Sequence, residues 1–108
     1  MATRAVIADN QKMFTEGIQA ILTDMRFPPI KIVGIAYSLE ELKKMTEFPI
    51  DLLILELALA DQQGTALISE LKRSQPNIKI IILSNYGEPN LVRDAFKQGA
   101  DGYVLKSN

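Results

Sequence analysis

The stretch that most constrains the fold of this chain runs from Asp51 to Leu59 and is apolar except at two carboxylates. A short apolar run of this kind is typical of a strand buried on both faces, as in the middle of a parallel sheet. Glu56 is the anomaly, because burying an unpaired carboxylate costs on the order of several kcal/mol. Ligands bind outside the carboxyl ends of the strands in open α/β sheets, so Glu56 indicates where a site is expected.

The rest of the chain alternates short β-branched runs with apolar positions at helical spacing. Strands are expected at residues 4–8, 30–36, 51–59, 78–83 and 102–105. Helices are expected from about 11 to 25, from a Ser38 N-cap to about 46, from 66 to before Pro76, and over 91–96 with Gly99 at the C-cap. Polar loops are expected at 61–64 and 86–90. This alternation predicts a five-stranded parallel sheet with crossover helices. We expect a doubly wound α/β fold that is flavodoxin-like, the fold in which the strand order is 2-1-3-4-5.

The predicted order also says how the helices are distributed. Because crossover connections are right-handed, the first helix lies alone on one face of the sheet and the next three lie on the other. One helix cannot cover a face of five strands. We therefore expect residues 1–108 to form one domain that lacks a fifth helix, which would follow Asn108, or that has this face covered by a partner.

Composition excludes several classes of function. The 108 residues contain no cysteine and no histidine, which excludes thiol chemistry, disulfides, histidine acid–base catalysis and a typical zinc site. A net charge of −1 gives no sign of nucleic-acid binding by this segment. No apolar run approaches the roughly 20 residues of a membrane span, and the first residues do not resemble a signal peptide. We expect a cytoplasmic protein with no membrane partner.

Polar residues follow the carboxyl ends of four of the predicted strands. They are Asp9, Asn10, Glu56, Ser84 and Lys106. Since the predicted strand order brings these ends together, two carboxylates, a hydroxyl and an ammonium should share one crevice, which suits a divalent cation with a phosphoryl group. Each residue also has an ordinary reading: Asp9 and Asn10 as helix caps, Ser84 as a loop hydroxyl and Lys106 as a surface charge.

These residues also carry a family resemblance. Segments 6–17, 51–64, 82–84 and 99–106 together resemble a response-regulator receiver domain, with a CheY-like fold, of two-component signalling. The sequences of the first and last of these segments are most similar to those of regulators with a LuxR-type helix-turn-helix output domain. The resemblance implies a sensor histidine kinase as partner, an output domain in the same chain that binds DNA, and compatibility with a homodimer.

The resemblance also implies roles for single positions. Glu56 stands at the phosphoacceptor position, and Ser84 and Lys106 are expected to contact the phosphoryl oxygens. Ser84 and Tyr103 stand at the switch positions. The Mg²⁺ site would involve Asp9, Asn10, Glu56 and Ala58.

Three positions depart from the family pattern. The family has an aspartate where this chain has Glu56, an acid where it has Asn10, and usually a proline where it has Ala60. The extra methylene of Glu56 displaces its carboxylate by roughly 1.5 Å, whereas in-line transfer loses rate after about 1 Å of misplacement. Neutral Asn10 weakens the cation site. We hypothesise a degenerate receiver, or pseudo-receiver, in which Glu56 pairs with Lys106 and imitates a permanently switched-on state.

The sequence is compatible with two alternative functions. One is a working receiver that is phosphorylated despite the substitutions, with Asp61 as a less favoured substitute acceptor and otherwise a solvated loop acid. The other is a small flavodoxin-like enzyme or carrier that binds FMN or a nucleotide. That function needs a loop rich in Gly, Ser or Thr after the first strand, whereas this chain has the acid-bearing loop 9–12.

Overall fold

The computed structural model describes residues 2–24 and 29–106 and contains five strands and five helical segments within them. The strands are β1 (Thr3–Ala8), β2 (Ile30–Ala36), β3 (Leu52–Glu56), β4 (Lys79–Ser84) and β5 (Gly102–Leu105). The helices are α1 (Lys12–Asp24), α2 (Leu39–Met45), the 3₁₀ helix η1 (Leu57–Gln63), α3 (Ala66–Ser74) and α4 (Pro89–Lys97).

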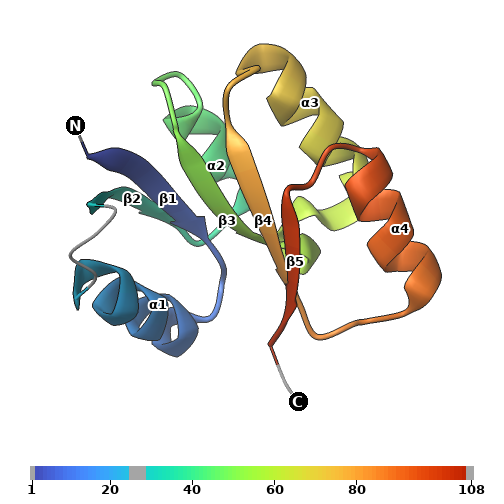
Figure 1. The fold of residues 1–108 in the computed structure, drawn as a ribbon, viewed down its shortest axis with the longest axis horizontal. Helices are drawn as coiled ribbons and strands as arrows, with labels where there is room; N and C mark the ends of the chain where they lie inside the picture. The colour runs from blue at the N-terminus through green and yellow to red at the C-terminus, as the bar shows by residue number, and fades with distance from the viewer. Residues whose placement is uncertain (1, 25–28, 107–108) are drawn as a thin grey trace.

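The strands form one parallel sheet in the order β2-β1-β3-β4-β5, which confirms the predicted topology (Figure 1). The register pairs Val6 of β1 with Leu53 of β3, and Leu55 of β3 with Ile82 of β4. Because all strands run the same way, the residues that follow them collect at one edge of the sheet. This edge is the lower one in Figure 1.

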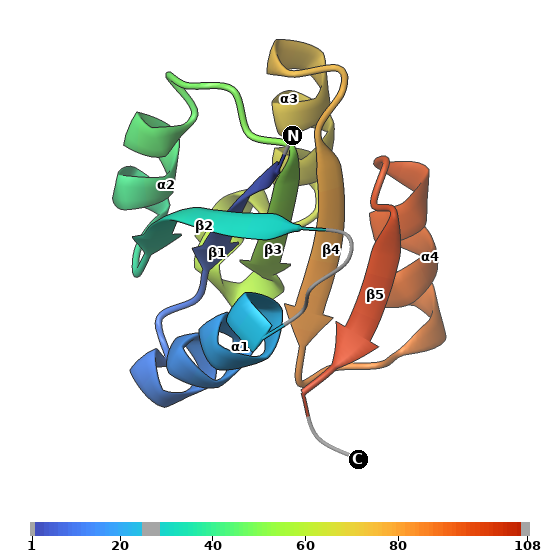
Figure 2. The same ribbon diagram turned by 60° about the vertical axis from the view of Figure 1, so that its left-hand side comes forward.

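Helices cover the two faces of the sheet unequally. α1 lies alone on one face, and α2, α3 and α4 lie on the other, as the strand order predicted (Figures 1 and 2). Alternate side chains of the central strands point toward the three-helix face because strand side chains alternate between faces. The buried core there includes Val6, Ala8, Leu53, Leu55, Ile80 and Ile82 from strands and Leu42, Leu67, Ile68, Leu71 and Ala95 from helices.

The α1 face is open over the last strand. Tyr103 packs against the core of the three-helix face, so its neighbour Val104 points to the α1 face, where 49% of its surface is exposed. Ile21 of α1 is 66% exposed. By contrast, Ile7 and Ile54, in the centre of the sheet, are buried. Apolar surface beside α1 is therefore left uncovered within the described residues.

The main difference from the sequence-based expectation follows Glu56. Residues 57–59 were expected to continue the strand and 61–64 to form a loop, but β3 ends at Glu56 and η1 begins at once. The Glu56 carboxylate accepts a hydrogen bond from the Ala58 N–H at 3.3 Å, which caps the new helix at its N-terminus. Leu57 and Leu59 are apolar because they are buried in the core from this helix, not from a strand.

Other boundaries differ by small amounts. α4 begins at Pro89, inside the turn expected at 86–90, since proline suits the first turn of a helix. The C-cap of α4 is Gln98, one residue before the expected Gly99. Gly99 comes next with a φ of 116°, a conformation that glycine adopts readily. The expected end of the first helix at Met25 lies outside the described residues. None of the helices in residues 2–24 and 29–106 is long and apolar enough to cross a membrane.

Candidate functional site

The candidate site lies where β1, β3 and β5 end. Asp9 follows β1, Glu56 is the last residue of β3, and Lys106 follows β5. The Lys106 N–H donates to the Ser84 carbonyl at 2.8 Å, which continues the pairing of β5 with β4 and directs the lysine toward the centre of the sheet edge. Pairing of the strands in one parallel sheet thus brings together residues that are far apart in the sequence.

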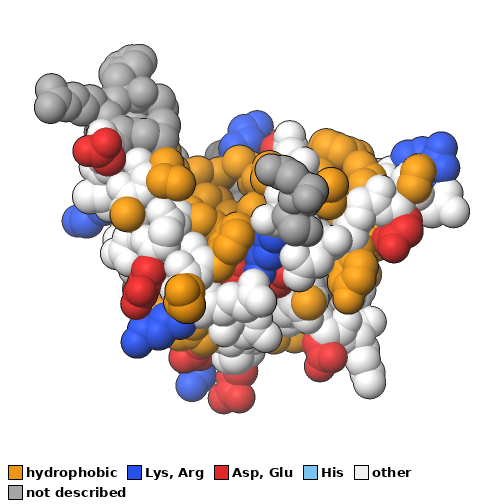
Figure 3. All heavy atoms as spheres, turned by 90° about the horizontal axis from the view of Figure 1, so that it is seen from below, with side chains coloured by type: hydrophobic (Ala, Val, Ile, Leu, Met, Phe, Trp, Pro, Cys, Tyr) orange, Lys and Arg blue, Asp and Glu red, His pale blue; other side chains and the backbone are white. Residues whose placement is uncertain are grey.

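The Lys106 ammonium is the centre of the site. Its Nζ lies 2.7 Å from Asp9 Oδ2 and 2.7 Å from Glu56 Oε1, and it donates to Gln11 Oε1, also at 2.7 Å. The lysine side chain is only 4% exposed, and both carboxylates are buried. Seen from below, basic and acidic groups meet in a hollow flanked by hydrophobic side chains (Figure 3).

Two features keep this buried cluster charged. Burial alone would lower the pKa of Lys106, but the hydrogen bonds and charges of Asp9 and Glu56 outweigh it and raise that pKa above its ordinary value. The second oxygen of each carboxylate also has a donor: the Gln11 N–H contacts Asp9 Oδ1 at 2.9 Å, and the Ala58 N–H contacts Glu56 Oε2 at 3.3 Å. Buried ions are stable only when paired and hydrogen-bonded in this way.

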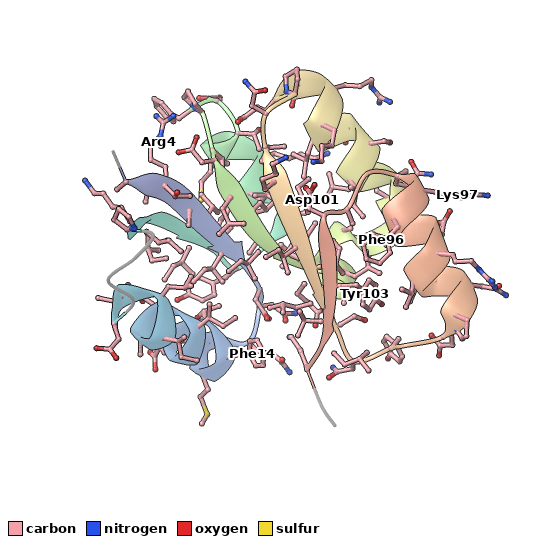
Figure 4. The ribbon with its side chains drawn as sticks, viewed as in Figure 1. Arg4, Phe14, Phe96, Lys97, Asp101 and Tyr103 are labelled. Carbon is pink, nitrogen blue, oxygen red and sulfur yellow. The ribbon has the colours of Figure 1, made fainter. Side chains whose placement is uncertain are left out.

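Ser84 and Tyr103, which the family resemblance predicted at switch positions, both contact the loop between β4 and α4. The Tyr86 N–H donates to Ser84 Oγ at 3.0 Å, and the Tyr103 hydroxyl donates to the Tyr86 carbonyl at 2.5 Å. Ser84 is buried, and the Tyr103 ring packs against the core. Figure 4 places Tyr103 on β5, on the side that faces α4. Both side chains therefore hold the segment between β4 and α4.

The arrangement does not fit a divalent cation as it stands. Asp9 Oδ1 and Glu56 Oε2 accept backbone hydrogen bonds, and Lys106 Nζ lies between the two acids, 2.7 Å from Asp9 Oδ2 and 2.7 Å from Glu56 Oε1. Asp9 Oδ2 is buried and has this ion pair but no hydrogen bond within the part of the chain that the structure describes. Asn10 and Ala58, the other two residues expected at a metal site, are exposed. Among the described residues, no group of three or more Asp, Glu, His or Cys side chains is arranged to hold a metal. Mg²⁺ would have to displace the ammonium.

Two residues of the site were not singled out by the sequence analysis. Gln11 supplies the third acceptor of the ammonium, and the centroid of the Phe14 ring lies 4.7 Å from Lys106 Nζ. Figure 4 shows Phe14 at the start of α1, beside the lower end of β5. The only feature of the sequence that could have indicated a site role for Gln11 is its position two residues after Asp9. Asp61 is exposed, as expected, but has a positive φ of 56°.

Comparison with known proteins identifies the family. A family model described as the response regulator receiver domain matches residues 5–108. The response regulator protein VraR of Staphylococcus saprophyticus is 31% identical over 108 residues, which cover 99% of this chain and 51% of that protein. This chain therefore spans about half the length of the curated relatives it matches.

Solved structures share the fold. A LuxR-family response regulator from Aurantimonas has a TM-score of 0.83 at 23% identity, covering 100% of this chain and 76% of that one. RcsB from Salmonella enterica, bound to promoter rprA in the presence of phosphomimetic BeF₃⁻, has a TM-score of 0.84 at 24% identity, covering 98% of this chain and 61% of that one. A Burkholderia pseudomallei response regulator with a phosphorylated aspartic acid, calcium ion and citrate has a TM-score of 0.80 at 23% identity, covering 98% of this chain and 61% of that one.

Proposed function

The chain belongs to the response-regulator receiver family, and from this premise we propose that it is a pseudo-receiver, a signalling module whose state is set without phosphoryl transfer. Receiver domains of two-component systems are signalling domains that bind Mg²⁺ at their phosphorylation site. In this chain the phosphoacceptor position is Glu56, and the site holds its own cation in place of an external one.

The observation that carries the proposal is the engagement of both Glu56 oxygens. Oε1 lies 2.7 Å from the Lys106 ammonium, and Oε2 accepts from the Ala58 N–H. A nucleophilic carboxylate needs an oxygen free to approach phosphorus in line, held close to the productive geometry. Glu56 has no such oxygen in this arrangement, and its extra methylene moves the carboxylate by roughly 1.5 Å relative to an aspartate.

The proposal extends to what the module controls. We propose that it regulates a helix-turn-helix output domain in the same, longer protein, which binds DNA, with β4, α4 and β5 as the output face. Supporting this are the length of the curated relatives and the promoter bound by RcsB. The open apolar face beside α1 would be covered by a further helix of that protein or by a partner. A cytoplasmic location and a homodimer remain parts of this proposal, whereas a sensor histidine kinase that phosphorylates the chain belongs to the alternative of a working receiver.

The direct test is phosphorylation with acetyl phosphate and Mg²⁺, read by intact mass. We expect no phosphoryl group on the wild-type chain, and we expect Glu56→Asp to gain one because its shorter side chain frees an oxygen. Glu56→Gln, which cannot form an acyl phosphate, is the matched control. Stoichiometric phosphate on Glu56 would establish the alternative, a working receiver. A flavin absorbance band in the purified protein would instead favour a cofactor carrier.

A further inference from the structure

We propose that Gln11 and Phe14 complete a closed cage around the Lys106 ammonium and act as the gate that keeps divalent cations and phosphoryl groups out of the site. The inference rests on the proposed function, because it names the residues that keep the pseudo-receiver site closed. It assigns positioning roles to the first turn of α1, which contributes neither the phosphoacceptor position nor the switch positions.

Three oxygens surround the ammonium, one through a hydrogen bond and two through ion pairs. Lysine has three N–H groups, and three oxygens, from Asp9, Glu56 and Gln11, each lie 2.7 Å from Nζ. The Phe14 ring adds a fourth wall, with its centroid 4.7 Å from Nζ, within the range of a cation–π contact. The remaining exposure of the lysine side chain is 4%. An incoming oxygen or cation therefore meets an ammonium that already contacts three oxygens and has little open space around it.

Gln11 joins both ends of the cage. Its backbone N–H donates to Asp9 Oδ1 at 2.9 Å while its side-chain oxygen accepts from Lys106. Its backbone carbonyl accepts from the Phe14 N–H at 3.0 Å, so the two residues belong to the same helical turn. Residues three apart lie on one side of a helix. Gln11 itself is exposed, so this turn stands on the solvent side of the ammonium.

The cage makes ligand entry a competition. A phosphoryl oxygen that binds Lys106 must replace the Gln11 hydrogen bond or one of the two ion pairs, each 2.7 Å long, and a divalent cation must separate the ammonium from both carboxylates. Removing the Gln11 acceptor lowers this barrier without changing the charge of the site. Replacing Gln11 by glutamate keeps an acceptor of the same reach, so Gln11→Glu should leave the cage closed.

The first measurement reports the cage in the wild-type chain. In ¹⁵N-labelled protein, the Lys106 ammonium protons should exchange with solvent slowly enough to give a ¹H–¹⁵N signal. Gln11→Ala and Gln11→Asn should speed this exchange by roughly 10-fold or more, since each removes a hydrogen bond to a charged group. Gln11→Glu should restore slow exchange. Gln62→Ala, at an exposed glutamine of η1 outside the cage, should leave it unchanged.

The second measurement reports the gate, in the Glu56→Asp background. Titration with Mg²⁺ and then with beryllofluoride, followed by ¹⁹F NMR, should show tighter binding when Gln11→Ala is added, by roughly 10-fold. Phe14→Leu keeps apolar volume but loses the cation–π contact, and should tighten binding by roughly 2- to 5-fold. Equal affinities with and without Gln11→Ala would overturn the gate.

The two proposals fail separately. Lys106 proton exchange that is the same in the wild type, Gln11→Ala and Gln11→Asn would overturn the cage and leave the pseudo-receiver proposal standing. Phosphorylation of wild-type Glu56 by acetyl phosphate would remove the pseudo-receiver proposal, and the gate with it, whatever the exchange rates show.

Discussion

The side chains of Ser84 and Tyr103 both form hydrogen bonds with the backbone of Tyr86: Ser84 Oγ accepts from the Tyr86 N–H, and the Tyr103 hydroxyl donates to the Tyr86 carbonyl. One residue lies on β4 and the other on β5, so the segment between β4 and α4 is held from two adjacent strands. The conformation of this loop therefore depends on two hydroxyl groups whose hydrogen bonds go to Tyr86 and not to the Lys106 cluster.

Removal of the Tyr103 hydroxyl should loosen this segment. Tyr103→Phe deletes one hydrogen bond worth about 1 kcal/mol and leaves the ring in place. We expect faster amide hydrogen exchange over residues 85–88, measured by mass spectrometry. Tyr37→Phe, at an exposed tyrosine after β2, is the control. Unchanged exchange in Tyr103→Phe would show that the hydroxyl does not hold the loop.

Removal of the buried cation should be strongly destabilising. Lys106→Met leaves Asp9 and Glu56 buried beside each other without their shared partner, and breaking a buried pair in this way costs about 3–5 kcal/mol. We expect urea denaturation to show that loss in the free energy of unfolding. Lys79→Met, at an exposed lysine of β4, should change it by about 0.5 kcal/mol or less. Similar effects of the two substitutions would contradict the buried cluster.

The ion pair at the opposite end of the sheet should give an acid-dependent contribution to stability. Lys72 Nζ lies 2.7 Å from Asp101 Oδ2, which also accepts from the Ile80 N–H at 2.8 Å. Burial alone would raise the pKa of Asp101, but the hydrogen bonds from Lys72 and Ile80 hold it below its ordinary value of 3.8. Figure 4 places Asp101 just before β5, near the top of the sheet.

The sign of this contribution follows from the lowered pKa. The unfolded chain binds more protons than the folded chain between the folded and unfolded pKa values, so the stabilisation is complete above the unfolded value and is lost as pH falls through the folded one. We expect the stability difference between wild type and Asp101→Asn to shrink as pH is lowered from about 7 to about 3. A difference that stays constant over this range would contradict the assignment. Asp24→Asn, at an exposed site, is the control.

Asp61 should be replaceable by glycine with a gain in stability. Its φ of 56° and ψ of −129° lie in a region that favours glycine, and such strain costs on the order of 1–3 kcal/mol. Relief of that strain exceeds the entropy that a glycine adds to the unfolded chain, so Asp61→Gly should stabilise by about 1 kcal/mol in thermal unfolding. Asp61→Ala keeps a Cβ and should give no such gain. Equal effects of the two variants would exclude backbone strain.

Sequence reasoning worked where the pattern is local. Apolar runs and helical spacing predicted every strand and α-helix, with boundary differences of a few residues. It failed after Glu56, because an apolar run that continues a strand cannot be told from a buried 3₁₀ turn by periodicity alone. The capping bond from Ala58 to Glu56 is a property of one side-chain conformation, which periodicity does not contain.

What the sequence determined by itself is the set of strands and helices and their parallel sheet, because these follow from local residue patterns. The strand order, and with it the convergence of Asp9, Glu56 and Lys106 at one edge, followed from the flavodoxin-like fold that these elements match. Only the tertiary structure decided how those groups pair. Gln11 meets Lys106 across 95 residues of sequence, and Phe14 meets it from the same helical turn. Such contacts depend on the packing of α1 against the sheet edge and on side-chain rotamers, which no spacing rule encodes.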